Sequence, residues 1–387
     1  MDNLLIIVSS FPDKNNTRTT NIFVKEQLKS LSKYFKKIYI LSPTSLGRKL
    51  RDCDRDFYKD YSFKNIYVYF PTYINTPYLK LLRKIWLYFE KKSIKKTIEK
   101  HAMKFDLIHA HYTWPSGAVS VELKKEFNVP VVITEHTSLT FRRVIEKKDK
   151  LYLNTWNYCD AIIRVRRKDI KDILNLGIPV NKVYHIPNGF DPSLFYPLSQ
   201  KNLRKKLNLP ENKKIILNVA NLYAVKGHVV LLEAIKEILK ERKDIFCVIV
   251  GEGPLKKNLR NEIRKLGLKE YIALVGAEPH EVIPLWMNAC DVFVLPSLSE
   301  GNPTVMFECL GCGVPFVGTR VGGIPEIITS ENYGLLVTPA DPRDLAEKIL
   351  IALEKKWDHR KIVEYSKKFT WEEISKEILN VYEEVLR

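Results

Sequence analysis

Short apolar runs that alternate with longer amphipathic stretches constrain the fold of this chain more than any other feature. In the first half of the 387 residues they lie at 4–8, 38–41, 66–70, 107–110, 131–134, 161–165 and 183–186. In the second half they lie at 215–220, 246–250, 272–275, 292–295, 314–317 and 335–337. Strands that are apolar on both faces, each followed by a helix, form parallel sheets that are covered on both sides. The pattern therefore predicts two doubly wound α/β domains.

A cluster of turn-forming residues at 187–192 separates the two series of runs. We predict an N-terminal domain over 1–187, a C-terminal domain over 188–368, and a last helix over 369–387 that packs back toward the N-terminal domain. Ligands of open parallel sheets bind at the carboxyl ends of the strands. Two Rossmann-like domains that face each other across a cleft would therefore hold a nucleotide or another anion there.

The segment that follows the apolar run at 292–295 has the features of an anion site. A helix is expected from Pro303, since proline suits a first helical turn. The backbone amides of Thr304 and Val305 would then face the preceding loop, in which Gly301 permits close backbone approach. The segment predicts a phosphate site at a helix N-terminus.

Two glutamates flank this helix start, Glu300 in the loop and Glu308 further along the helix. A carboxylate beside a phosphate site is electrostatically unfavourable unless it accepts hydrogen bonds, for example from sugar hydroxyls. The alternative interpretation is a pair of exposed glutamates that flank a helix cap.

The spacing of Glu300 and Glu308 resembles the E-x7-E signature of the retaining glycosyltransferases of family 4 (glycosyl transferases group 1), which have the GT-B architecture. Further segments are similar to the family in order and spacing: I-P-N-G-F-D at 186–191, V-A-N-L-Y-A-V-K-G at 219–227, V-G-E-G-P at 250–254, G-G-I-P-E at 322–326 and Y-G-L-L-V at 333–337. The resemblance extends over nearly the whole chain. Its N-terminal part, with H-A-H at 109–111, looks closest to surface-polysaccharide transferases of bacteria and archaea.

The resemblance implies roles for three side chains. Glu308 would hold the nucleotide ribose, and Glu300 would lie beside the transferred sugar. Lys226 would reach the diphosphate and neutralise the charge that develops on the leaving group. For Lys226 the alternative is a solvated lysine in front of a glycine turn. The nucleotide-sugar is a substrate, so neither a cofactor nor a metal ion is expected.

The chain departs from the family pattern in two places. Asn221 stands where an arginine is usual, five residues before the lysine, so the diphosphate loses one charged partner. The loop over 9–21 lacks the glycine that many relatives have, and Asn21 occupies the nearest matching position. Because asparagine tolerates a positive φ, the turn can still form, and Asn21 stays a candidate donor contact.

Three histidines, His109, His111 and His136, lie at the carboxyl ends of two successive expected strands. His136 aligns with a family position close to the donor sugar, where it would donate a hydrogen bond to a hydroxyl or a phosphate. The alternative for each histidine is a strand-end side chain that is satisfied by the backbone.

Almost all of the formal charge of +18 belongs to the first half of the chain. Residues 1–200 hold 35 basic and 19 acidic groups, whereas residues 201–387 hold 28 and 26. The element between Tyr78 and Lys104 concentrates this charge beside an apolar stripe, as do helices that lie on anionic membranes. A helix packed on its own sheet, with solvated lysines, is the alternative. Nucleic acid is not expected, because no motif for it accompanies the charge.

Metal and redox sites are not expected either. The D-x-D pattern at 52–56 lies in a run of charges, and Cys309 and Cys312 lie in an expected helix without a second Cys or His pair. No apolar run in the sequence is long enough to span a membrane, and we do not expect a secretory signal at its start. We expect a cytoplasmic protein that binds peripherally to the inner membrane face.

The sequence thus predicts a retaining glycosyltransferase that moves a sugar from a nucleotide-sugar donor to an acceptor hydroxyl. The acceptor would be a polysaccharide or lipid-linked intermediate. A nucleotide-sugar epimerase of the same architecture and a non-catalytic sugar-nucleotide binder are the alternatives.

Overall fold

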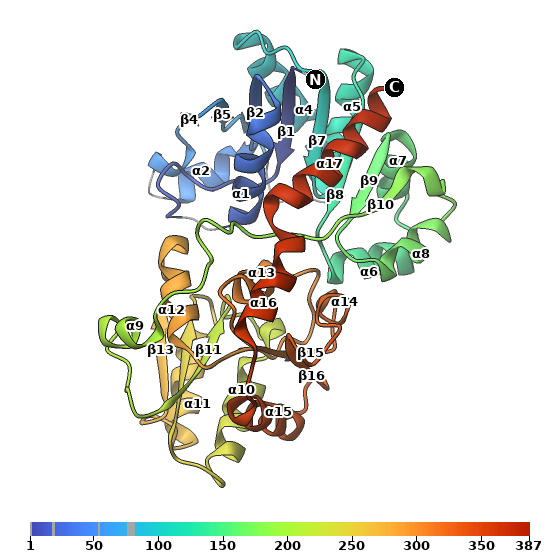
Figure 1. The fold of residues 1–387 in the computed structure, drawn as a ribbon. Helices are drawn as coiled ribbons and strands as arrows, with labels where there is room; N and C mark the ends of the chain where they lie inside the picture. Colours follow the sequence, from blue (N-terminus) through green and yellow to red (C-terminus); the bar gives the residue numbers. More distant parts are fainter. Residues whose placement is uncertain (1, 18–19, 53–54, 76–81) are drawn as a thin grey trace. The chain divides into compact units, whose positions relative to one another are not determined.

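The computed structural model describes residues 2–17, 20–52, 55–75 and 82–387, and these divide into two compact units. Unit 1 comprises residues 1–187 together with 371–387, and unit 2 comprises residues 188–370. Each unit contains one large sheet with helices on both faces (Figure 1). The expected fold class, two doubly wound α/β domains, is confirmed.

Unit 1 is built on an eight-stranded sheet in the order β10-β9-β8-β7-β1-β2-β5-β4, parallel except between β4 and β5. The strands of unit 1, including β3 and β6 outside this sheet, are β1 (Asn3–Val8), β2 (Lys37–Leu41), β3 (Thr44–Ser45), β4 (Tyr61–Phe63), β5 (Ile66–Tyr69), β6 (Thr72–Tyr73), β7 (Leu107–His111), β8 (Val131–Glu135), β9 (Ala161–Arg164) and β10 (Val183–His185). Its helices are α1 (Ile22–Leu31), α2 (Leu46–Arg51), α4 (Arg83–Lys100), α5 (Ala118–Phe127), α6 (Leu139–Lys147), α7 (Lys150–Tyr158), α8 (Lys168–Leu174) and α17 (Trp371–Leu386). The short strands β3, β4 and β6 were not expected from the sequence.

Alternate residues of β1 show why this sheet needs cover on both sides. Leu4 and Ile6 pack with α1 and α17, whereas Leu5 and Ile7 pack with the layer of α4 to α8. Successive side chains of a strand point to opposite faces, so an all-apolar strand is stable only between two helical layers. Figure 1 shows α17, in red, running beside α1 on the first of these faces.

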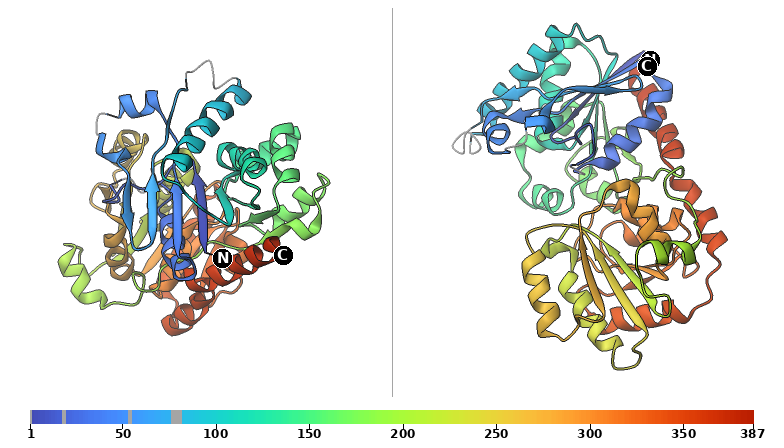
Figure 2. Two further views of the ribbon diagram at one scale, coloured as in Figure 1. Left: turned by 90° about the horizontal axis from the view of Figure 1, so that it is seen from above. Right: turned by 90° about the vertical axis from the view of Figure 1, so that its left-hand side faces the viewer.

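Unit 2 is built on a six-stranded parallel sheet in the order β13-β12-β11-β14-β15-β16, whose yellow strands run side by side in Figure 2. Its strands are β11 (Lys214–Val219), β12 (Ile245–Val250), β13 (Ile272–Gly276), β14 (Val292–Leu295), β15 (Phe316–Thr319) and β16 (Gly334–Val337). Its helices are α9 (Gln200–Lys206), α10 (His228–Ile238), α11 (Lys256–Lys265), α12 (Ile283–Ala289), α13 (Thr304–Gly311), α14 (Ile324–Ile327), α15 (Pro342–Glu354) and α16 (His359–Ser366).

Each sheet has one place where the strand order reverses. In unit 2 the chain lays β12 and β13 on one side of β11 and β14 to β16 on the other. In unit 1 it lays β2 and β5 on one side of β1 and β7 to β10 on the other. Ligands of such sheets bind outside the carboxyl ends of the strands at this switch point. The loops that follow β11 and β14, and those that follow β1 and β7, are therefore the first places to look for a site.

Candidate functional site

An ion pair joins the two switch-point loops of unit 2. The Nζ of Lys226, after β11, lies 2.6 Å from Oε1 of Glu300, after β14. The hydroxyl of Ser297 donates a second 2.6 Å hydrogen bond to the same oxygen. Glu300 is only 7% exposed, so its charge is held by these two donors and not by bulk water. The structure thus brings together two residues that the sequence singled out.

Glycines hold the backbone around this ion pair. A Cβ on Gly227, whose φ is +68°, would lie 2.0 Å from the carbonyl oxygen of Pro296. A Cβ on Gly322, whose φ is +60°, would lie 2.3 Å from the carbonyl oxygen of Glu300 and 2.9 Å from that of Gly301. No side chain fits at such distances, and positive φ also favours glycine. The loops therefore fix Lys226 and Glu300 through direct backbone contact.

Helix α13 begins beside this pair, at Thr304. The first amides of a helix, here those of Thr304 and Val305, have no carbonyl partner within the helix. Asn188 tethers the loop in front of them: its backbone N–H donates to Oδ1 of Asn302 at 2.9 Å, and its Nδ2 donates to the Asn302 carbonyl at 2.7 Å. A tethered helix start with a nearby lysine is suited to bind an anion.

Glu308 lies in α13 and is nearly buried. Its Oε1 lies 3.2 Å from Nε2 of His280, and the His280 ring packs 5.3 Å from that of Phe195. Sequence reasoning did not pair His280 with Glu308, because no motif in the sequence connects the two. A carboxylate that is oriented by a histidine can accept hydrogen bonds from a diol.

His228 is a residue that sequence reasoning missed. It begins α10, directly after Gly227, and neither ring nitrogen has a hydrogen-bond partner among the described residues. Burial and the charge of Lys226 lower its pKa to about 4, so the imidazole is neutral at pH 7. Its place next to the expected Lys226–Gly227 turn was the available signal. The side chain of Asn221, which replaces the usual arginine, is exposed.

In unit 1, Asn21 connects the two switch-point loops. It adopts the left-handed conformation that its side chain tolerates, with φ +60°. Its Nδ2 donates to the carbonyl of Ser10 at 2.9 Å, and its Oδ1 accepts a 2.6 Å hydrogen bond from the hydroxyl of Tyr112. Ser10 follows β1 and Tyr112 follows β7, so a neutral hydrogen bond stands where unit 2 has an ion pair.

His136 belongs to a row of three histidines in unit 1. Its ring is parallel to that of His111, and Nδ1 of His111 lies 3.0 Å from Nε2 of His136. The inner histidine, His109, is fully buried between the hydroxyls of Tyr382, at 2.5 Å, and Thr134, at 2.7 Å. Burial lowers the pKa of His111 to about 3 and that of His109 well below its ordinary value. Both inner rings are therefore neutral, and His109 serves the packing of α17.

Comparison with known proteins decides the family. The model of Glycosyltransferase Family 4 matches residues 37–194, and that of Glycosyl transferases group 1 matches residues 199–369. An uncharacterised glycosyltransferase of Methanocaldococcus jannaschii is 32% identical over 354 residues, which cover 88% of this chain and 93% of the relative. The chain belongs to glycosyltransferase family 4.

Solved structures agree on the fold of this glycosyltransferase. A sucrose-phosphate synthase from Thermosynechococcus elongatus superimposes with a TM-score of 0.80 at 21% identity, over 100% of this chain and 99% of the other. Anabaena HepE, solved in complex with UDP, superimposes with a TM-score of 0.75 at 19% identity, over 99% of this chain and 100% of the other. Both likenesses support the GT-B fold.

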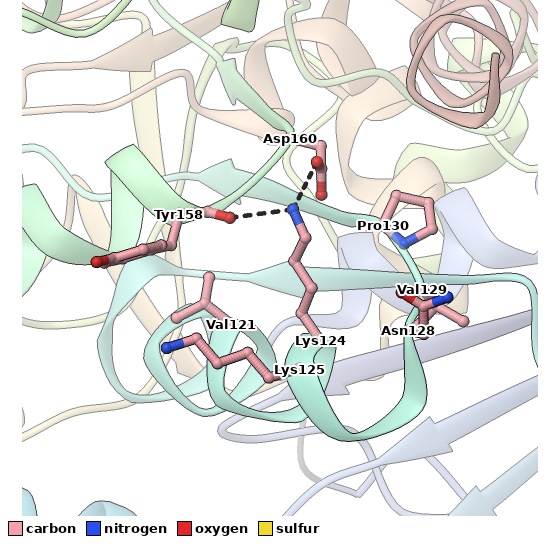
Figure 3. Close-up of a pocket in the computed structure, with 8 residues that line it drawn as sticks. All are labelled: Val121, Lys124, Lys125, Asn128, Val129, Pro130, Tyr158 and Asp160. Carbon is pink, nitrogen blue, oxygen red and sulfur yellow. Dashed lines mark hydrogen bonds and ion pairs between the residues drawn. The ribbon is translucent and has the colours of Figure 1, made fainter.

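One cavity of the glycosyltransferase lies at the end of the unit 1 sheet opposite to the one where ligands of such sheets bind. It measures ≈ 460 Å³ and is lined by Val121, Lys124, Lys125, Asn128, Val129, Pro130, Tyr158 and Asp160 (Figure 3). Pro130 precedes β8 and Asp160 precedes β9, so the cavity faces the amino ends of these strands. Lys124 is paired with Asp160 at 2.6 Å. Neither the position nor this neutralised charge favours a substrate site.

The described part of the glycosyltransferase contains no cluster of three or more His, Cys, Asp or Glu side chains that could hold a metal ion. Cys53 and Asp54 of the D-x-D segment lie outside the described residues. Cys309 and Cys312 are buried in the core of unit 2, and burial raises the pKa of both thiols. No helix among the described residues is both long and apolar enough to cross a membrane.

Proposed function

We propose that this glycosyltransferase transfers a sugar from a nucleotide-sugar donor to an acceptor hydroxyl with retention of the anomeric configuration. The observation that carries the proposal is the Lys226–Glu300 pair at the switch point of unit 2, beside the start of α13. Anabaena HepE has been solved with UDP, which supports a nucleotide donor in a protein of the same fold.

In the proposed complex the diphosphate lies between Lys226 and the first amides of α13. Lys226 then exchanges part of its contact with Glu300 for the β-phosphate, and the amides of Thr304 and Val305 donate to phosphate oxygens. Glu308 accepts hydrogen bonds from the ribose hydroxyls, with His280 fixing its orientation. Glu300, partly released, lies beside the transferred sugar.

The chemical step needs no protein nucleophile. The bond from the anomeric carbon to the diphosphate oxygen breaks, and the acceptor oxygen forms its bond on the same face. The departing phosphate oxygen takes the proton of the acceptor hydroxyl. Lys226 and the helix amides stabilise the negative charge on the leaving group without a metal ion. Asn221 adds only a neutral amide, which makes Lys226 the main cation of these loops.

Asn21 and His136 are proposed as the contributions of unit 1 to the donor. Asn21 would present its left-handed turn to the phosphate, and His136 would hydrogen-bond a sugar hydroxyl. The row of neutral histidines behind His136 supports the second role, because His111 holds the ring in a fixed orientation.

Product analysis with a labelled donor tests the proposal. Sugars of UDP, GDP and ADP are incubated with the full chain, and the products are separated and their anomeric configuration is read by NMR. Transfer with retention and release of the nucleoside diphosphate is expected. Sugar isomerisation without nucleotide release would indicate an epimerase, and binding without any turnover would indicate a non-catalytic binder. A Glu300→Ala chain with full transferase activity would refute the site assignment.

We also propose that the acceptor is a polysaccharide or lipid-linked intermediate presented at an anionic membrane surface. The exposed side of α4 supports this: Ile85 and Tyr88 lie open to solvent, and so do Lys84, Lys92 and Lys96. Lys91 and Lys95, by contrast, pair with Glu126 of α5 and face unit 1 itself. Residues 76–81, where the expected helix begins, lie outside the described residues.

Vesicle co-sedimentation tests the membrane proposal. At low salt the full chain should bind vesicles rich in phosphatidylglycerol and leave phosphatidylcholine vesicles unbound. Lys92→Glu/Lys96→Glu should abolish this binding. The matched control, Lys201→Glu/Lys205→Glu on α9, has the same charge change and spacing and should bind as the unaltered chain does. Equal loss in both variants would contradict a role for α4.

A further inference from the structure

A second cavity, of ≈ 720 Å³, lies at the switch point of the unit 1 sheet. Its wall includes Ser9 and Ser10, which follow β1, Pro43, which follows β2, and Pro115, which follows β7. It thus faces the carboxyl ends of the central strands, where ligands of doubly wound sheets bind. The proposed roles of the donor residues leave this cavity unused.

A buried carboxyl forms part of the wall of the cavity. Glu90 of α4 is 1% exposed, and its Oε2 accepts a 2.8 Å hydrogen bond from Nε1 of Trp86. The hydroxyl of Tyr73 also hydrogen-bonds the carboxyl. Its other oxygen, Oε1, has no hydrogen-bond partner among the described residues, and neither has Oδ1 of Asn75. Two buried oxygens without partners are costly, so their presence in one cavity wall indicates a ligand that completes them.

The electrostatic balance of the cavity favours an anion despite this carboxyl. Burial raises the pKa of Glu90 to about 8, so at pH 7 the group is mostly protonated and can donate a hydrogen bond. The cations that line the cavity are Arg48 and Arg51 of α2, and the charge of Arg48 also acts on the Tyr73 hydroxyl.

The ion pairs that these two guanidinium groups form with the nearby carboxylate of Asp52 are long. The groups lie 3.9 and 4.0 Å from the Asp52 side chain, which also accepts a 2.5 Å hydrogen bond from Tyr58. The side chains of Arg48 and Arg51 are 43% and 78% exposed. A phosphate or carboxylate with bidentate geometry would bind them more favourably than these long pairs do.

We infer that this cavity binds the acceptor of the transfer and selects a polyol that carries an anionic substituent. Arg48 and Arg51 bind the phosphate or carboxylate of the acceptor. Glu90 and Asn75 hydrogen-bond its hydroxyl groups inside the cavity. That the bound molecule is the acceptor depends on the proposed function, whereas the presence of a binding site depends only on the cavity.

Calorimetric titration of the full chain tests the inference. The probes are glucose 6-phosphate, glucuronate and glucose, which share a polyol and differ in the anion. Both anionic probes should bind at least tenfold more tightly than glucose, and the tighter of the two identifies the anion. Arg48→Ala/Arg51→Ala should lower their affinity at least tenfold, while the affinity for UDP stays unchanged. Lys49→Ala, on the same helix but outside the cavity wall, is the matched control and should bind like the unaltered chain.

Glu90→Gln separates a ligand role from a merely structural one. Glutamine resembles the protonated carboxyl, so this variant should bind glucose 6-phosphate equally at pH 7 and pH 9. The unaltered chain should lose affinity severalfold between these pH values, because the ionised Glu90 repels the anion. Parallel pH profiles of the two chains would contradict a contact with Glu90.

Two outcomes would overturn the inference: equal binding of glucose and the anionic probes, or unchanged binding in Arg48→Ala/Arg51→Ala. The proposed function fails in a different way. Suppose that glucose 6-phosphate binds through Arg48 and Arg51 but no nucleotide-sugar supports transfer to any hydroxyl. The cavity would then be a binding site, and the proposed glycosyl transfer would be refuted.

Discussion

The two sheets of this glycosyltransferase present the same topological position with opposite chemistry. At the switch point of unit 2, Lys226 and Glu300 form an ion pair. At that of unit 1, Tyr112 donates a neutral hydrogen bond to Asn21. The half of the chain with the smaller net charge thus has the charged switch point. Bulk charge is therefore a poor guide to where an anion is held, and a few fixed groups decide it.

The two positions also differ in how they are braced. In unit 2 the loops touch backbone to backbone at Gly227 and Gly322. In unit 1 side chains make the connections, through Asn21 and the row of histidines behind His136. A site fixed by the backbone is expected to tolerate almost no change in geometry. A site fixed by side chains is expected to lose function gradually, one contact at a time.

The largest expected effect comes from Gly227→Ala. The added methyl group collides with the Pro296 carbonyl, so transferase activity should be lost and the free energy of unfolding should fall by about 3 kcal/mol or more. Gly177→Ala is the matched control, because Gly177 also has a positive φ, +86°, but has open space around its Cβ position. It should cost about 1 kcal/mol with activity retained. Urea unfolding followed by circular dichroism measures the free energy of unfolding of both variants. Equal losses of stability would contradict the claim that backbone contact at Gly227 fixes the loops.

The next effect compares the two switch points directly. Lys226→Met should lower kcat/KM by about 10²–10³-fold, as expected for a group that stabilises leaving-group charge. Tyr112→Phe removes one neutral hydrogen bond, so it should raise the activation free energy by about 1 kcal/mol and lower kcat/KM roughly fivefold. Steady-state kinetics with a saturating acceptor gives both values. If Tyr112→Phe were as severe as Lys226→Met, the contrast between a charged and a neutral switch point would be wrong.

A smaller effect is expected from Glu308→Gln. The amide keeps the size of the side chain but offers only one oxygen to a diol, so the Kd for UDP should rise by about tenfold, or ~1.4 kcal/mol. Calorimetry measures this Kd. Glu262→Gln on α11, where the side chain is 39% exposed, is the control and should leave this Kd unchanged. An unaltered Kd in Glu308→Gln would remove Glu308 from the proposed ribose contact.

The last comparison concerns acid stability, where each side chain contributes little. Burial holds the pKa of His109 and His111 in unit 1, and of His228 in unit 2, below the value in an unfolded chain. The stability from these neutral rings is present above pH 6.5 and is lost as the pH falls toward their folded values. From pH 6.5 to 5.5 each ring should cost about 1 kcal/mol. Hydrogen exchange should therefore show about 2 kcal/mol lost in unit 1 and about 1 kcal/mol in unit 2; equal losses would contradict this difference.

The sequence predicted the framework of the fold well, because apolar runs and amphipathic stretches have distinct periods. The helix expected from Pro303 agrees with α13, which begins at Thr304, and the expected runs lie on the strands of both large sheets. The short strands β3, β4 and β6 were not predicted, because two or three residues are too few to show a hydrophobic periodicity.

The candidate site was predictable only in part. Lys226 and Glu300 were found because they lie in motifs of a resembled family, and the structure shows them in contact. His228, His280 and Glu90 have no such motif. Their significance depends on burial and on neighbours distant in the chain, as with Glu90 between Trp86 and Tyr73. In the sequence, a glutamate among the lysines of α4 cannot be distinguished from an ordinary solvated charge on a helix surface.

Hydrogen–deuterium exchange with and without UDP tests whether the charged switch point of unit 2 holds the donor diphosphate. We predict slower exchange of the backbone amides over residues 220–227 and 296–305, with the largest change at Thr304 and Val305. Slower exchange elsewhere in the chain, with both of these segments unchanged, would contradict it.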